Sequence, residues 1–225
     1  MVVDGSTVGA LPRPREHVVF ARTTTIQADR SKVEDGITRV RDQVFPAVTA
    51  IDGCVGMSLL VDRESGRCIA TTAWESEDAM QASAEGVKPL RADAQEGLGT
   101  TSSDVDTWEV SVMHRVHDTP DGGWARVTWL SGDDGFAERA ADTFRMAILP
   151  RLQEWDGFCS ASLMTNMETG RAVGTVTFAT RAQLEATRES AQELRRRGSE
   201  EMRGQIDDMA EMEVAFAHLH VPELV

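Results

Sequence analysis

The sequence predicts an α+β protein built from two copies of one unit, each a small antiparallel sheet with helices on one side. The first observation behind this prediction is a repeat. The 225-residue chain aligns with itself at a spacing of 104 residues, so that Gly53 matches Gly157 and Phe20–His117 matches Trp124–Val221 without a gap. The second is that each copy alternates strand-like and helix-like segments in the same order. Such a repeat indicates the duplication of a unit of about 100 residues, an ordinary domain size.

The repeat also sets the predicted boundaries. Residues 1–17 precede it as an N-terminal tail, residues 18–117 form the first unit, residues 118–123 form a linker, and residues 124–225 form the second unit. The linker lies within HDTPDGG, whose Pro, Asp and Gly residues are typical of turns. Identical residues at equivalent positions include Arg22 and Arg126, Glu34 and Glu138, Arg41 and Arg145, Pro46 and Pro150, Arg67 and Arg171, Arg91 and Arg195, Glu109 and Glu213, and His114 and His218.

Each element of the first unit has its own signal. VVFARTTTIQ, residues 18–27, is rich in β-branched residues and predicts a strand. Residues 31–48 carry apolar residues at helical spacing, with Ser31 as the expected cap. CVGMSLLVD and RCIATTAWES flank the turn signal ESG and predict a hairpin. Residues 77–97 predict a helix that Gly86 and Pro89 bend or break, and TWEVSVMHR predicts a fourth strand.

The second unit repeats this order, so βαββαβ occurs twice. That is the ferredoxin-like arrangement, a four-stranded antiparallel sheet with both helices on one face. Neither face of the first strand is strongly polar: residues 20, 22, 24 and 26 point to one side and residues 19, 21, 23 and 25 to the other. Both faces of each sheet are therefore expected to be buried. We expect the two sheets to form a central barrel within one chain, as a pseudo-dimer with the helices outside.

Composition excludes several classes of partner. A formal net charge of −14 repels nucleic acid and anionic lipid surfaces. No apolar run is long enough to span a membrane and the N-terminus does not look like a secretory signal, so a cytoplasmic location is expected. Cys54, Cys68 and Cys159 form no CxxC motif and are interpreted as small buried hydrophobic residues. The basic cluster ELRRRGSEEMR, residues 193–203, is interpreted as a solvated helix face.

The element order, the DG pair that opens the second strand, and above all TTAWESEDAM, residues 71–80, resemble the antibiotic-biosynthesis monooxygenase family of dimeric α/β barrels. The resemblance covers nearly the whole of each unit, and this chain is similar to a fused tandem version of that family. It implies the barrel fold and a small-molecule site. Relatives differ in chemistry: some oxygenate aromatic substrates without a cofactor, others degrade haem, and others have no known activity.

In catalytic relatives the tryptophan of the third strand lines a pocket between sheet and helices, and Trp74 matches that position. Ala70 and Thr72 lie on the same face of the strand, which leaves room beside the ring for a flat apolar ligand, although close packing of a helix explains the same pattern. In the second unit Phe178 replaces the tryptophan, so the pocket of the first unit is the better candidate. The polar candidates are Arg22, Thr72 and Arg126; Arg22 suits either a structural ion pair or a ligand anion.

Two functions stay open. The first is cofactor-independent oxygenation of a small aromatic or apolar compound. The second is a catalytically silent protein that binds a small ligand or serves a structural role, because the chain has no tyrosine and no histidine between His17 and His114. Haem degradation is disfavoured for the same reason, and no cofactor is expected. His218 and His220 share a strand face without a third ligand nearby, so no metal site is predicted. Further dimerisation through the outer helices also stays open.

Overall fold

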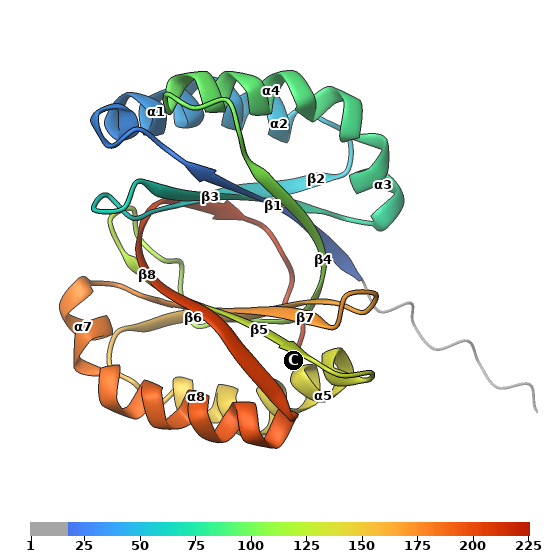
Figure 1. Ribbon diagram of the computed structural model, residues 1–225, viewed down its shortest axis with the longest axis vertical. Helices are drawn as coiled ribbons and strands as arrows, with labels where there is room; N and C mark the ends of the chain where they lie inside the picture. The colour runs from blue at the N-terminus through green and yellow to red at the C-terminus, as the bar shows by residue number, and fades with distance from the viewer. Residues whose placement is uncertain (1–17) are drawn as a thin grey trace, which may run out of the picture.

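The structure is a computed structural model that describes residues 18–225. The predicted tail, residues 1–17, lies outside the described residues. Two ferredoxin-like halves, here called unit one and unit two, are stacked with their sheets facing each other and their helices outward (Figure 1). The predicted α+β class, with two βαββαβ units, is confirmed.

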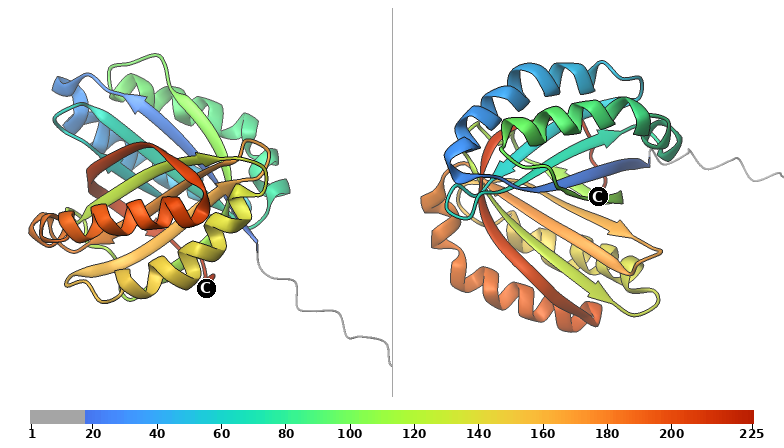
Figure 2. Two further views of the ribbon diagram at one scale, coloured as in Figure 1. Left: turned by 60° about the horizontal axis from the view of Figure 1, so that its bottom comes forward. Right: turned by 45° about the horizontal axis from the view of Figure 1, so that its top comes forward.

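Unit one contains four strands and an outer layer of helices (Figure 2). Its first helical segment includes a π-helical turn, η2, just before the helix that starts at Phe45 and Pro46. The elements in order are β1 Val19–Gln27, η1 Arg30–Lys32, α1 Val33–Arg39, η2 Val40–Val44, α2 Phe45–Thr49, β2 Cys54–Val61, β3 Arg67–Trp74, α3 Glu77–Ala82, α4 Ala84–Gly97 and β4 Asp104–Arg115.

Unit two repeats these elements except the 3-10 turn η1, and it includes the π-helical turn η3 before a proline at the start of a helix. The turn recurs with the sequence repeat, so the shape of the first helical segment follows from residues shared by both copies. The elements in order are β5 Trp124–Gly132, α5 Phe136–Thr143, η3 Phe144–Ile148, α6 Leu149–Leu152, β6 Phe158–Asn166, β7 Arg171–Phe178, α7 Arg181–Ala186, α8 Arg188–Met202 and β8 Gly204–Leu219.

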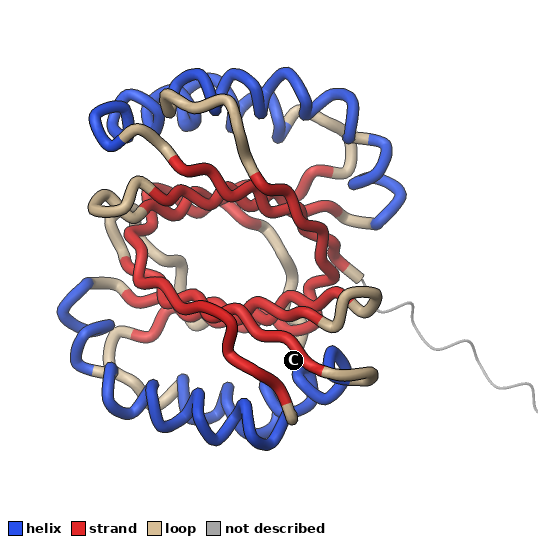
Figure 3. The backbone as a smooth tube through the Cα atoms, in the orientation of Figure 1, coloured by secondary structure: helices blue, strands red, loops and turns tan. Residues whose placement is uncertain are grey.

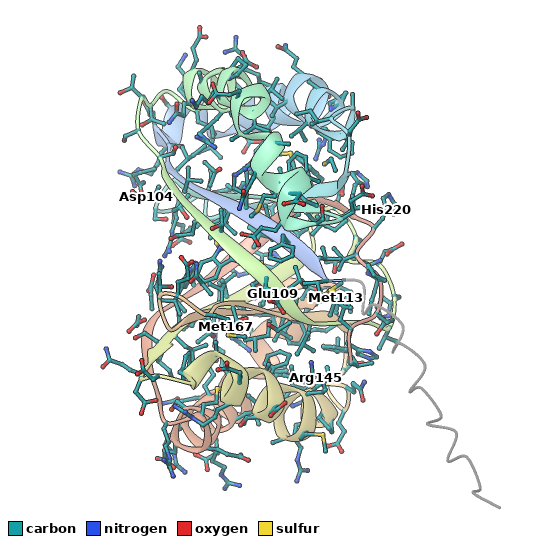
Figure 4. The ribbon with its side chains drawn as sticks, turned by 90° about the vertical axis from the view of Figure 1, so that its right-hand side faces the viewer. Asp104, Glu109, Met113, Arg145, Met167 and His220 are labelled. Atoms are coloured by element: carbon teal, nitrogen blue, oxygen red, sulfur yellow. The ribbon has the colours of Figure 1, made fainter. Side chains whose placement is uncertain are left out.

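The eight strands form one closed antiparallel barrel in the order β1-β3-β2-β8-β5-β7-β6-β4. The barrel closes because the last strand of each unit is long enough to serve both sheets. β4 pairs with β1 of its own unit and then with β6 of unit two, while β8 pairs with β5 and then with β2 of unit one. Figure 4 shows β4 running from Asp104 on the unit-one side to Met113 on the unit-two side. The predicted barrel within one chain is thus confirmed.

Three apolar layers hold this arrangement together. One fills the inside of the barrel and includes Trp108 and Met212, and the other two lie between each sheet and its own helices. In Figure 3 the strands surround the centre and the helices cover the two outer faces. Both faces of each sheet are therefore buried, as the alternation along the first strand predicts. Val19 and Ala21 point into the barrel and Ile26 points to the helices of unit one.

The DG pair at the start of β2 and β6 is a turn that needs glycine. Gly53 and Gly157 have φ angles of 78° and 72°, in the left-handed region that side chains disfavour. A Cβ atom at Gly53 would also lie 2.6 Å from the Cβ of Ala79 in α3. The repeated DG motif therefore marks a tight approach between the hairpin and the following helix.

Two local predictions are wrong. Asp29, not Ser31, provides the first cap, because its carboxylate accepts a hydrogen bond from the Ser31 backbone N–H. The second helical segment breaks at Ser83, between α3 and α4, while Gly86 and Pro89 lie inside α4. Side-chain bonds from β1 fix the end of α3 at that point, as described below.

The cysteine predictions agree with the structure, and the basic cluster is solvated in part: Arg195 does not lie on the solvated face but lines a cavity described below. Cys68 and Cys159 are buried and Cys54 is partly buried, and burial raises the pKa of the Cys68 thiol to about 11. Glu193 accepts hydrogen bonds from Arg196 and Arg197 on the exposed face of α8. Among residues 18–225, no helix combines the length and the apolar character needed to cross a membrane.

Candidate functional site

Each unit contains a cavity between the outer face of its sheet and its second long helix. The unit-one cavity has a volume of about 50 Å³ and the unit-two cavity about 70 Å³. Both are mainly apolar, and most lining positions correspond across the repeat. The unit-one cavity is lined by Arg22, Thr24, Ile26, Val44, Val48, Met57, Ala70, Thr72, Val87, Leu90, Arg91 and Ala94.

The same two arginines face each cavity. Arg22 in β1 and Arg91 in α4 line the unit-one cavity, and Arg126 in β5 and Arg195 in α8 line the unit-two cavity. The strand arginines lie on the sheet face that points toward the helices. The helix arginines lie one turn beyond Val87 and Ala191, on the buried side of each helix. Two guanidinium groups per apolar cavity form a feature that core packing alone does not require.

Arg22 is 7% exposed and has only neutral partners. Its Nη1 donates to the Ser83 hydroxyl at 3.0 Å and its Nη2 donates to the Met80 carbonyl at 2.6 Å. These bonds hold the junction between α3 and α4, which explains the helix break there. Within residues 18–225 Arg22 makes no salt bridge. Burial, together with the nearby charge of Arg91, lowers the pKa of Arg22.

Arg126 makes the equivalent neutral bonds and also has a carboxylate partner. It donates to the Thr187 hydroxyl at 2.9 Å and the Leu184 carbonyl at 3.0 Å, as Arg22 does to Ser83 and Met80. In addition, Nη2 of Arg126 lies 2.8 Å from Oε1 of Glu211. Glu211 also accepts a hydrogen bond of 2.6 Å from Arg188. Unit two thus contains an internal ion-pair network that unit one lacks.

Strand register explains this difference. Arg126 lies opposite Glu211 in the β5–β8 pairing, and Arg22 lies opposite Thr107 in the β1–β4 pairing. The repeat also places Ala84 at the position of Arg188. One carboxylate and its second arginine partner are therefore present in unit two and replaced by neutral residues in unit one.

The electrostatics of Glu211 follow from these contacts. Burial by itself would raise the pKa of its carboxyl group, but hydrogen bonds from Arg188 and Arg126 and their positive charges outweigh burial, so the pKa is lowered. Arg195 has a lowered pKa because of burial and the charge of Arg126. Its Nη1 atom is buried and has no hydrogen-bond partner among the described residues.

The predicted aromatic residues lie beside the cavities rather than in their walls. Trp74 is fully buried, and its indole N–H donates to the Thr72 hydroxyl at 3.1 Å. The guanidinium carbon of Arg22 lies 5.8 Å from the Trp74 ring centre, within cation–π range. Phe178 is equally buried and stacks with Trp155 at 6.2 Å. Of the predicted site residues, Arg22, Ala70, Thr72 and Arg126 line a cavity directly.

Neither helix-side cavity supplies a base. Among the described residues that line them there is no Asp, Glu, His, Tyr, Lys or Cys, so their polar groups are guanidinium and hydroxyl groups. No group of three or more metal-ligating side chains occurs within residues 18–225. The residues present suit the binding of an anion better than proton abstraction, because arginine stays protonated and donates hydrogen bonds.

A third cavity, of about 110 Å³, lies inside the barrel. Its walls combine apolar side chains, hydroxyl groups and the charged residues Arg115 and Asp118, whose Nη1 and Oδ1 atoms lie 3.6 Å apart. The Thr177 hydroxyl lies 2.7 Å from that of Ser160 and 2.6 Å from that of Thr119. These hydroxyl groups satisfy one another, and none of the predicted site residues lines this cavity. The two helix-side cavities, each with an arginine pair and no acid in its lining, are therefore the stronger candidates for a functional site.

Sequence reasoning did not select Arg91, Arg195 or Glu211. The first two carried a usable signal, because they are identical across the repeat and lie four residues after Val87 and Ala191, which share the apolar helix face. Glu211 carried a weaker one. Its importance depends on its cross-strand position opposite Arg126, which requires the register of β5 and β8.

No protein-family model matches the chain. Two curated relatives are the uncharacterized Mycobacterium tuberculosis H37Rv proteins Rv2557 and Rv2558. The first is 44% identical over 223 residues, covering 98% of this chain and 99% of that protein; the second is 47% identical over 223 residues, covering 98% and 94%.

Solved structures with the same fold support the resemblance seen in the sequence. An anthrone oxidase-like protein has a TM-score of 0.62 at 12% identity, covering 93% of this chain and 94% of that one. A Listeria monocytogenes ferredoxin fold protein related to antibiotic biosynthesis monooxygenases has a TM-score of 0.52 at 9% identity, covering 88% and 95%. At such low identity the likeness concerns the fold, and at that level it confirms the similarity to the antibiotic-biosynthesis monooxygenase proteins.

Proposed function

The chain belongs to the family of the Mycobacterium tuberculosis proteins Rv2557 and Rv2558, and we propose that it binds a small, predominantly apolar molecule in the unit-one cavity. The observation that carries this proposal is the pair Arg22 and Arg91, which face an apolar cavity without a carboxylate partner among the described residues. Burial of a charged group is costly unless it is paired. A bound ligand would supply the missing interaction.

Binding is favoured over catalysis because the cavity lacks a group that can remove a proton. In the oxidation of an anthrone, for example, one oxygen atom of O₂ becomes the oxygen of the new ring carbonyl and the other leaves as water with the two hydrogens of the CH₂ group, and the reaction proceeds through the deprotonated substrate. Neither Arg22 nor Thr72 acts as a base near neutral pH. We therefore place oxygenation second. It is favoured by one observation, that two guanidinium groups could stabilise a phenolate or enolate that arrives already ionised.

A pair of measurements separates the two functions. Native mass spectrometry of the purified chain, and thermal shift with a panel of small apolar compounds, should reveal binding that weakens in Arg91→Met. An oxygen electrode with simple anthrones and quinols should show no uptake above the rate without protein. Uptake that depends on Arg22 and Arg91 would favour oxygenation. If no compound binds and none co-purifies, the proposed function is wrong.

A further inference from the structure

We propose that the ligand of the unit-one cavity is a short apolar carboxylate, whose alkyl chain lies in the cavity and whose carboxylate binds Arg22 at the cavity edge, where Glu211 binds Arg126 in unit two. This inference rests on the proposed function and deepens it. Its basis is a comparison that the molecule itself provides: two copies of one arginine pair, one with an internal carboxylate and one without.

The two sites share the arrangement of their arginines and differ in the carboxylate, in its partner Arg188, and in cavity size. In both, the strand arginine donates to a hydroxyl and to a carbonyl at the end of the helix that follows β3 or β7. In both, a helix arginine faces the same cavity. Unit two adds the Oε1 atom of Glu211, 3.2 Å from Nε and 2.8 Å from Nη2 of Arg126. Both bonds end on the same carboxylate oxygen, and they are charge-assisted hydrogen bonds of the kind by which guanidinium groups bind carboxylates.

Charge accounts for the need for an anion in unit one. The two guanidinium groups repel each other, and burial lowers the pKa of Arg22 with no carboxylate acting in the opposite direction. In unit two the hydrogen bonds and charges of Arg126 and Arg188 lower the pKa of Glu211 despite its burial, so the carboxylate is bound in its ionised form. An anionic ligand would do for Arg22 and Arg91 what Glu211 does for Arg126.

The apolar part of the ligand is limited by space. Apart from its arginines, the cavity wall consists of aliphatic side chains, Ala70, Ala94, Met57 and two threonines. Its volume of about 50 Å³ is well below the ~150 Å³ of a cavity that holds benzene. Butyrate as a whole is about as large as benzene, so only its three-carbon chain fits this space, with the carboxylate outside it beside Arg22. Butyrate is therefore a suitable probe, and benzoate tests the size limit.

The decisive variant gives unit one its own carboxylate. Thr107→Glu places an acid opposite Arg22, as Glu211 lies opposite Arg126, and Thr107 is exposed, so the substitution should not disturb folding. Thr107→Gln is the matched neutral control. In the other direction, Glu211→Gln removes the internal acid from unit two and should create a second site.

Binding is measured by titration calorimetry and by NMR of isotope-labelled butyrate, with melting temperatures recorded for every variant. We expect one butyrate per wild-type chain, with butyramide binding at least about tenfold more weakly because it lacks the charge. Thr107→Glu should weaken butyrate by about tenfold or more, Thr107→Gln should not, and Glu211→Gln should bind a second equivalent.

Each contrary result has a distinct meaning. Equal binding of butyrate and butyramide, or unchanged butyrate binding by folded Thr107→Glu, would overturn the carboxylate assignment and leave the proposed function standing. Tighter binding of benzoate than butyrate would overturn the short-chain assignment. If neither probe binds and no other apolar compound does, the proposed function fails and this inference fails with it.

Discussion

Unit one and unit two have the same helix-side cavity and the same arginine pair, but they balance the arginine charge differently. In unit two, Glu211 lies between Arg126 and Arg188 and completes an ion-pair network within the protein. In unit one, Arg22 matches Arg126, but Thr107 and Ala84 replace Glu211 and Arg188. No described acid forms a salt bridge with Arg22. Both units therefore keep the arginine pair, although only unit two contains a carboxylate that balances its charge.

The two cavities also differ in size. Unit two has Gly174 and Gly198 where unit one has Ala70 and Ala94, and its cavity is the larger at about 70 Å³. The larger cavity thus lies beside Arg126, which already pairs with Glu211, and the smaller one lies beside Arg22. Size and charge thus distinguish the two cavities, and each of the following predictions tests one part of this difference.

The largest expected effect concerns Phe178 and Trp74, the equivalent aromatic residues of the two units. Phe178→Ala should lower the free energy of unfolding by about 4 kcal/mol, because it removes a fully buried ring that stacks on Trp155, yet leave unit-one binding nearly unchanged. Trp74→Phe should cost less stability but weaken the unit-one ligand about fivefold, because Thr72 loses its indole donor beside Arg22. Chemical denaturation and titration calorimetry measure both. Equal losses of binding would mean that Trp74 serves only in core packing.

Next in size is the ion pair of unit two. Glu211→Gln should lower the free energy of unfolding by about 3 kcal/mol, because it leaves Arg126, which is 4% exposed, without its carboxylate. Glu213→Gln is the matched control on the same strand. Its partner Arg63 is 39% exposed, so the loss should be below about 1 kcal/mol. Equal losses for the two variants in urea denaturation would show that the buried network contributes no more than a surface pair.

Acidification should remove the same contribution. The pKa of Glu211 is lower in the folded protein than its ordinary value of 4.5, so the stabilisation is fully present above pH 4.5 and is lost as the pH falls through the folded value. The difference in unfolding free energy between wild type and Glu211→Gln should therefore be constant from pH 7 to pH 5 and shrink below that. Other carboxylates with lowered pKa values, such as Glu193, are present in both proteins and cancel. A difference that grows on acidification would contradict the ion-pair interpretation.

The smallest effect tests the size of the unit-two cavity. Gly174→Ala should raise the free energy of unfolding by about 0.5 kcal/mol, because the new Cβ would lie 3.6 Å from Phe144 and 3.8 Å from Leu163, at ordinary contact distances. Gly157→Ala provides the contrast. Its φ of 72° and the overlap of a new Cβ with the Gln183 side chain predict destabilisation. Thermal melts measure both, and destabilisation by Gly174→Ala would mean that the open space has a structural role.

Most of the fold is predictable from the sequence because the repeat provides two sequences, one in each unit, from which the same element can be predicted. The strand order and the barrel follow from βαββαβ and from the buried character of both sheet faces. The helix break was placed wrongly because Gly86 and Pro89 are strong local signals, whereas the break at Ser83 depends on bonds from Arg22, 61 residues away. A local pattern does not contain such a tertiary contact.

The candidate site was predictable only in part. Arg22, Arg126, Thr72 and Ala70 were identified from strand alternation, and all four line cavities. Trp74 and Phe178 were expected in the walls but pack beside them, and whether they affect binding stays a prediction. Glu211 requires the exact register of β8, which contains a shift between residues 129 and 130 of its partner β5. Register depends on the whole barrel and cannot be read from one strand.

The exchange of β4 and β8 between the two sheets has an evolutionary consequence. A barrel made from two identical subunits obeys two-fold symmetry, so a substitution in one pocket appears in both. Covalent fusion removes that constraint while the shared strands keep the halves inseparable. One pocket could then acquire a permanent carboxylate and become a fixed part of the scaffold, and the other could keep its unbalanced arginines for a molecule from outside. On the proposed function, fusion lets a symmetric barrel specialise its two sides without losing the contacts that close it.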